Sequence, residues 1–130
     1  MLSIGIKYTI QLSVSSEHTA KTIQSGGLDV LATPTLIGLM EKCTWQSVSP
    51  FMENGYDTVG TEITMKHLSP TPIGGLVKCE SELISVNGRE LTFHITAYDN
   101  CSKIGEAIHK RFIIKTLSFQ GKATEKLTQS

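Results

Sequence analysis

The chain has 130 residues, and its twelve basic and twelve acidic side chains give a formal net charge of zero. This balance excludes the broad positive field by which proteins attract nucleic acid or anionic lipid. A hydrophobic content of 39% with 18% charged residues is ordinary for one soluble globular domain. Because no apolar stretch approaches the ~20 residues of a membrane span, we expect neither nucleic acid nor a membrane as a partner.

The cysteines indicate the compartment. Cys43, Cys79 and Cys101 are odd in number, form no CxxC pair, and have no zinc-like spacing with the four histidines. Reduced thiols are typical of cytosolic proteins. The N-terminal segment alternates and includes Lys7, unlike the apolar core of a signal peptide. We therefore expect a cytoplasmic protein without a metal site.

In chain order, alternation and β-forming residues predict a first strand over 7–14. A polar loop over 15–27 follows. Apolar residues then recur at helical spacing up to residue 49, with Pro34 suited to the first turn and Pro50 closing the segment. The helix is expected to begin at 34 or 35. Because it is apolar around most of its circumference, we expect neighbouring elements to wrap it.

The rest of the domain is predicted to be β-structure, with strands over 58–68, 76–86, 90–98 and 104–117. The Asn87-Gly88 pair predicts a hairpin turn. An antiparallel sheet must cover its apolar face, and only one long helix is available. We therefore predict an α+β hotdog fold, a five-stranded antiparallel sheet wrapped around one long central helix, over 1–118. A polar tail over 119–130 is expected to be frayed from Gln120 onward.

Glu41 lies in the most apolar part of the predicted helix. Val48 lies within about 40° of it on a helical wheel. A carboxylate there needs a partner or changes its protonation, and such groups are over-represented at active sites. The structural alternative is a pair with Lys42 or a thin solvent-facing stripe.

His67 is predicted to share the inner face of its strand with Ile63 and Met65, because side chains alternate along a strand. The alternative role is a core histidine that bonds a backbone carbonyl. His94 alternates with threonines and is expected to be exposed. His109 lies in a strand whose two faces the pattern does not separate.

Thr33 precedes Pro34, which favours an extended conformation. It, or Thr35, could simply cap the helix. A helix continuous from Pro34 would separate Thr33 from Glu41 by ~12 Å along its axis. Direct contact between them therefore requires the chain before the helix to fold back over its first turn.

Three strings, ATPTLIGLMEKC, VGTEITMKHLSPTPIG and GEAIHKRFII, resemble the fluoroacetyl-CoA thioesterase group of the hotdog thioesterase superfamily over about residues 28–114. The most specific elements of that group are a Thr eight residues before a helical Glu and a His 26 residues after it. Thr33, Glu41 and His67 match both spacings. Gly60 and Arg111 match the Gly of its Gly-Thr pair and its last-strand Arg.

The resemblance implies an enzyme that hydrolyses a small acyl-CoA thioester to the free acid and CoA, with no cofactor beyond the CoA of the substrate. Glu41 would act as nucleophile or general base, held by Thr33, while His67 shuttles a proton. Gly60 would bring a backbone N–H to the thioester oxygen. Arg111 would organise the site or contact CoA. Direct attack by Thr33 stays open.

Aromatic residues shape the entrance in that group, whereas residues 24–28 here include none, so the resemblance implies the reaction and not the acyl group. We expect a homodimer, or a tetramer built from it, because the sheet has free edges and the CoA site of the group is interfacial. One alternative is a non-catalytic acyl-CoA-binding or structural hotdog dimer. A hydratase is disfavoured because no His lies between Thr33 and Pro50.

Overall fold

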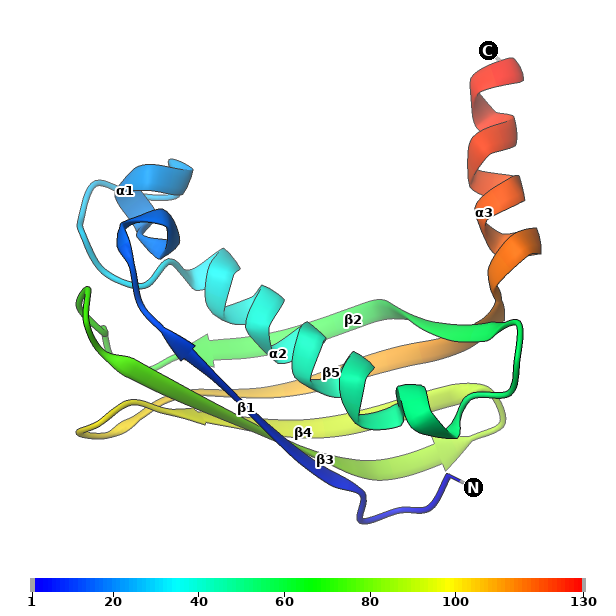
Figure 1. Cartoon of the computed structure of the whole chain (residues 1–130), viewed down its shortest axis with the longest axis horizontal. Coiled ribbons are helices and arrows are strands. Elements are labelled where there is room, and N and C mark those ends of the chain that lie inside the picture. Colours follow the sequence, from blue (N-terminus) through cyan, green and yellow to red (C-terminus); the bar gives the residue numbers. More distant parts are fainter. Residues whose placement is uncertain (1, 130) are drawn as a thin grey trace.

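A computed structural model describes residues 2–129 and shows a long helix lying across one face of a five-stranded antiparallel sheet (Figure 1). The strands are β1 (Lys7–Ser13), β2 (Tyr56–His67), β3 (Leu76–Asn87), β4 (Glu90–Tyr98) and β5 (Lys103–Lys115). The helices are α1 (Ala20–Ile23), α2 (Thr33–Val48) and α3 (Thr116–Glu125). Single 3-10 turns are η1 (Ser16–His18), η2 (Ser49–Phe51) and η3 (Lys126–Thr128).

The strand order is β1-β3-β4-β5-β2, and every neighbouring pair is antiparallel. All five predicted strands and the long helix are present, so the predicted architecture is confirmed. The chain crosses from β1 to the opposite edge through α2, which places β2 at a free edge of the sheet. A bulge between Gly60 and Glu62 interrupts the pairing of β2 with β5.

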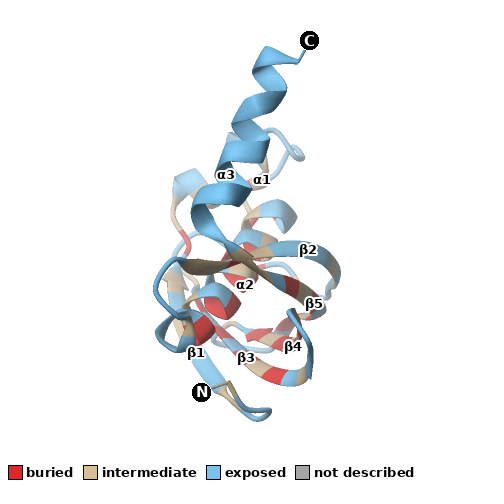
Figure 2. Cartoon of the chain, turned by 90° about the vertical axis from the view of Figure 1, so that its right-hand side faces the viewer, coloured by how far each residue is buried: buried red, intermediate tan, exposed pale blue. Residues whose placement is uncertain are grey.

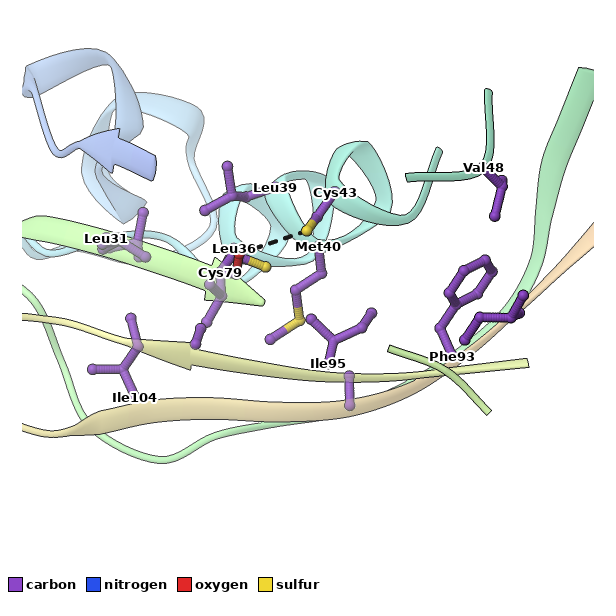
Figure 3. Close-up of a cluster of buried hydrophobic side chains, with 14 of the residues drawn as sticks. Leu31, Leu36, Leu39, Met40, Cys43, Val48, Cys79, Phe93, Ile95 and Ile104 are labelled. Atoms are coloured by element: carbon purple, nitrogen blue, oxygen red, sulfur yellow. Dashed lines mark hydrogen bonds between the residues drawn. The ribbon is translucent and has the colours of Figure 1, made fainter. Parts of the chain in front are cut away.

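Helix α2 begins at Thr33, with Ala32 as N-cap and Pro34 in the first turn. One face packs on the sheet, where Met40 and Cys43 lie among core side chains such as Ile95 (Figure 3). The buried residues of α2 are Leu36, Leu39, Met40, Cys43, Thr44, Ser47 and Val48. The opposite face, which carries Gly38, Lys42 and Trp45, is exposed in the single chain. Among residues 2–129, no helix is long and apolar enough to cross a membrane.

The hairpin between β3 and β4 is tighter by one position than predicted. Asn87 pairs with Glu90, which leaves Gly88 and Arg89 as the two loop residues. Gly88 has φ +63°. Glycine adopts this angle without steric cost, and its place as first loop residue is typical of a type II′ turn.

The C-terminal segment differs most from prediction. Strand β5 ends at Lys115, and Leu117 belongs to α3 instead of the strand. The expected frayed tail from Gln120 is helical through Glu125, and the predicted boundary at 118 falls inside α3. No residue of α3 is buried, and the helix projects from the body (Figures 1 and 2). Its leucine, glutamine, lysine, alanine and glutamate are good helix formers, which polarity alone does not reveal.

Candidate active site

Thr33 and His67 meet where α2 begins and β2 ends. The Oγ1 of Thr33 lies 2.8 Å from Nδ1 of His67. As predicted, His67 shares its strand face with Ile63 and Met65, and all three are half-buried between exposed neighbours. The helix-cap reading of Thr33 is wrong, because the N-cap is Ala32 and no side chain caps the helix.

The second ring nitrogen of His67 has no partner. Its Nε2 is the one buried side-chain nitrogen or oxygen without a hydrogen bond among residues 2–129. Burial lowers the pKa of His67 against a smaller opposing effect of the Ser69 backbone, so the ring is neutral near pH 7. An unpaired buried polar atom costs roughly 1–3 kcal/mol and calls for an explanation in a native protein. His67 also lines a surface hollow of about 280 Å³.

Glu41 lies against β2 at Gly60. A Cβ added to Gly60 would lie 2.9 Å from Oε2 of Glu41, so only glycine leaves room for the carboxylate there. Glu41 is half-buried, and within residues 2–129 it forms no ion pair with Lys42, which removes that alternative. A cavity of about 350 Å³ adjoins the carboxylate and is lined by Glu41, Lys42, Trp45, Thr58, Val59, Gly60 and Arg111.

Arg111 is the cation of this cavity and is only 6% exposed. Its Nε donates to Oγ1 of Thr58 and its Nη2 to the carbonyl oxygen of Thr58, both at 2.9 Å. Its Nη1 lies 3.2 Å from Nε2 of His109. Burial lowers the pKa of Arg111, and the Glu41 carboxylate opposes that shift. The guanidinium is therefore fixed beside Glu41 as a buried positive charge, which favours the predicted role of organising the site.

Sequence reasoning left His109 unassigned, and the structure places it in this cluster. It is 1% exposed, and its Cε1 would lie 3.0 Å from a Cβ on Gly60. Ala107, His109 and Arg111 are buried at alternate positions of β5, but the sequence of the strand alone does not mark this face as the inner one. The contrast residue His94 lies on the other face of the sheet, as predicted, but is half-exposed and bonds Glu106 at 2.8 Å.

The predicted trio does not converge within one chain. Glu41 lies at Gly60, whereas His67 is seven positions further along the same strand, roughly 20 Å away. Helix α2 runs unbroken from Thr33, so that residue is ~12 Å from Glu41 along the axis. The expectation that Thr33 holds Glu41 of its own chain is therefore wrong. Glu41 therefore lies beside Gly60 in the first half of β2, and the Thr33–His67 pair lies at the end of that strand.

Residues 14–117 match the model of the fluoroacetyl-CoA-specific thioesterase family. The chain belongs to this family. The fluoroacetyl-CoA thioesterase of Streptantibioticus cattleyicolor is 36% identical over 98 residues, which are 75% of this chain and 70% of that protein. The prediction of a hotdog-fold acyl-CoA thioesterase is thereby confirmed at the level of the family, and the non-catalytic alternative loses support.

Solved structures agree with this assignment. A structure of fluoroacetyl-CoA thioesterase superposes with a TM-score of 0.92 at 30% identity, covering 97% of this chain and 98% of that one. A mutant of the same enzyme in complex with fluoroacetate and CoA superposes at 0.87, with 30% identity over 91% and 99% of the two chains. A thioesterase superfamily protein from Thermus thermophilus, 19% identical over 100% and 98%, shares the fold at 0.90.

Proposed function

We propose that this protein hydrolyses a short-chain acyl-CoA at a site formed by two protomers, in which Glu41 of one protomer faces Thr33 and His67 of the other. The observation that carries the proposal is the separation of the two half-sites along β2. Glu41 with Arg111 lies beside Gly60 in the first half of the strand, and the Thr33–His67 pair with its unpartnered Nε2 lies at its last residue. Each half-site lacks what the other supplies.

The free edge of β2 offers the contact that would join them. Edge strands present unpaired backbone groups that are commonly covered by another chain. Two copies of β2 paired antiparallel about a twofold axis near Thr64 would bring Gly60 of one protomer close to the partner's His67. Both active sites of the homodimer would then lie on the interface. A tetramer and a cytoplasmic location remain predictions.

The chemistry follows from the groups in each half-site. Glu41 removes a proton from a water whose oxygen bonds to the thioester carbonyl carbon, and the carbon–sulfur bond then breaks to give the free acid and the CoA thiolate. If Glu41 itself attacks, the same bond breaks to leave an acyl anhydride on Glu41, which a water then hydrolyses to the free acid. The partner's His67 relays the proton to the leaving CoA thiolate, a role typically worth about 10²–10⁴-fold in rate. The Thr33 hydroxyl, bonded to Nδ1, holds the ring with Nε2 directed to this transfer. The same 2.8 Å bond also fits a histidine-activated threonine nucleophile, which is the second candidate mechanism.

The acyl group is expected to be short and not specifically fluorinated. The relatives that match are named for fluoroacetyl-CoA. Residues 24–28, which lead toward Thr33, are exposed and contain no aromatic side chain to shape a selective entrance. A panel of acetyl-, propionyl-, butyryl- and fluoroacetyl-CoA, with thiol release as the readout, would rank these substrates.

Subunit complementation tests the shared site. Glu41→Gln and His67→Ala variants are purified, each expected to be nearly inactive, then mixed, unfolded and refolded together. A mixed dimer carries one doubly mutated site and one intact site. Because random pairing makes half of the dimers mixed, roughly a quarter of wild-type activity should return.

A site contained within one protomer predicts no recovery in the mixture, and this result would refute the shared site. Each variant refolded alone is the control for incomplete inactivation. The variant Thr64→Cys provides a second check, since an axis near this exposed position should place the two introduced thiols within disulfide range.

A further inference from the structure

The hydrogen bonds of His109 fix the position of its proton. Its Nδ1 lies 2.8 Å from the carbonyl oxygen of Glu62, and a carbonyl only accepts, so Nδ1 carries the hydrogen. Nε2 of the neutral ring then offers a lone pair to Nη1 of Arg111 at 3.2 Å. Burial lowers the pKa of His109 and keeps the ring neutral; the charge of Arg111 adds to this shift, and the Glu62 hydrogen bond and the Glu41 charge oppose it.

All three nitrogens of the Arg111 guanidinium are hydrogen-bonded, but not all of its N–H groups have an acceptor. A guanidinium has five N–H groups. Thr58 accepts from two of its nitrogens and His109 from the third. The described residues supply no acceptor for the remaining N–H groups at Nη1 and Nη2, and Arg111 lines the same cavity as Glu41.

A gap separates this guanidinium from the carboxylate. Glu41 Oε2 and Arg111 Nη1 lie 2.9 Å and 3.4 Å from the position that a Cβ on Gly60 would take, yet within residues 2–129 no direct ion pair joins them. One water molecule needs about 2.8–3.0 Å to each partner, so a gap of this kind has room for a single bridging water. The absent side chain of Gly60 is what keeps this space open.

We propose that His109 is a positioning residue for thioester hydrolysis: as a neutral acceptor it holds Arg111 so that its free N–H groups and the Glu41 carboxylate bind the attacking water between them. This inference rests on the proposed function. Arg111 donates to the water oxygen, and Glu41 accepts one of its protons. Without an acceptor at position 109, Thr58 alone holds the guanidinium. The whole planar group can then tilt so that Nη1 pairs directly with Glu41, which would displace the water and stop the carboxylate from acting as a base.

Two variants at position 109 test the role. His109→Leu has a similar volume but no acceptor, whereas the Oε1 of His109→Gln can still accept from Arg111. Loss of one hydrogen bond to a charged group corresponds to a fall in kcat of roughly 10- to 100-fold. We expect this fall for His109→Leu with KM nearly unchanged, and a kcat within about threefold of wild type for His109→Gln.

Unimpaired kcat in His109→Leu would overturn the proposal. So would equal losses in both variants that follow their melting temperatures, since this pattern indicates packing alone. ¹⁵N NMR of the His109 ring supplies a readout independent of turnover: the proton should be on Nδ1 and Nε2 should be bare. A proton found on Nε2 excludes donation from Arg111 and refutes the proposal.

The outcomes separate the two proposals. A wild-type protein that hydrolyses none of the acyl-CoA panel refutes the proposed function and this inference together. An active enzyme that depends on Glu41 but tolerates His109→Leu refutes this inference alone.

Discussion

The substitution Gly60→Ala tests the centre of the Glu41 half-site with a single methyl group. The added Cβ would lie 2.9 Å from Oε2 of Glu41, closer than real Cβ contacts allow, and 3.0 Å from Cε1 of His109, which is tighter than most real contacts. Glu41 ends a flexible side chain and can swing away, whereas the His109 ring is buried and can yield only slightly. The main consequence is therefore a carboxylate displaced by up to ~1 Å.

Displacement of this size at a catalytic group typically costs on the order of 10²-fold in rate. Overpacking by one methyl costs about 1–3 kcal/mol of folding free energy. We expect Gly60→Ala to fold, to melt several degrees lower, and to lose roughly 10- to 100-fold in kcat. Thiol release at saturating acyl-CoA and thermal unfolding by circular dichroism measure the two effects separately.

Gly121→Ala is the matched control. A Cβ at Gly121 meets nothing within 4 Å, and the residue is exposed in α3. Alanine there should favour the helix by up to ~1 kcal/mol and leave kcat unchanged. Wild-type turnover in Gly60→Ala would show that Glu41 need not approach β2, and the reasoning about this half-site would then fail.

Two further predictions concern Thr33 and acid stability. Thr33→Ser should keep most of kcat because the hydroxyl that bonds His67 survives. Thr33→Ala should lose about 3- to 10-fold in kcat with an almost unchanged melting temperature. Near-complete inactivation of Thr33→Ala would instead support the threonine nucleophile. Burial lowers the pKa of both His67 and His109 in the folded protein. As the pH falls below about 6.5, these two histidines therefore bind protons more readily in the unfolded chain than in the folded one. The free energy of unfolding should therefore fall from about pH 6.5 toward pH 5, by up to about 1.4 kcal/mol per pH unit for His109. If the melting temperature of His109→Leu falls with pH as steeply as that of the wild type, this prediction is contradicted.

Local patterns were sufficient to predict most of the fold. Strand β4 has the predicted limits, and the other predicted strand limits differ by at most two residues. Period-two alternation also placed His67 on the inner face and His94 on the outer face. These predictions succeeded because the burial of alternate apolar side chains determines which face of a strand is inside.

The same rule was ambiguous in β5 because polar side chains lie on the inner face of this strand and apolar ones on its outer face. His109 and Arg111 are buried, whereas Ile108 and Phe112 are substantially exposed. Polar side chains can occupy the inner face here only because Glu62, Thr58 and the Glu41 cavity satisfy them. Those partners come from β2 and α2, so no pattern within the strand itself could reveal the cluster.

The spacing of Thr33, Glu41 and His67 predicted a site but not its geometry. Sequence spacing fixes distances only along one element, and it placed Thr33 and Glu41 ~12 Å apart in a continuous helix. The structure shows that the helix is continuous and that His67 bonds Thr33, so the histidine is far from Glu41 of its own chain. The contradiction disappears if the three residues act across a twofold axis. An interface relates positions that neither the sequence nor the fold of one protomer brings together, and mixing Glu41→Gln with His67→Ala subunits measures that relation directly.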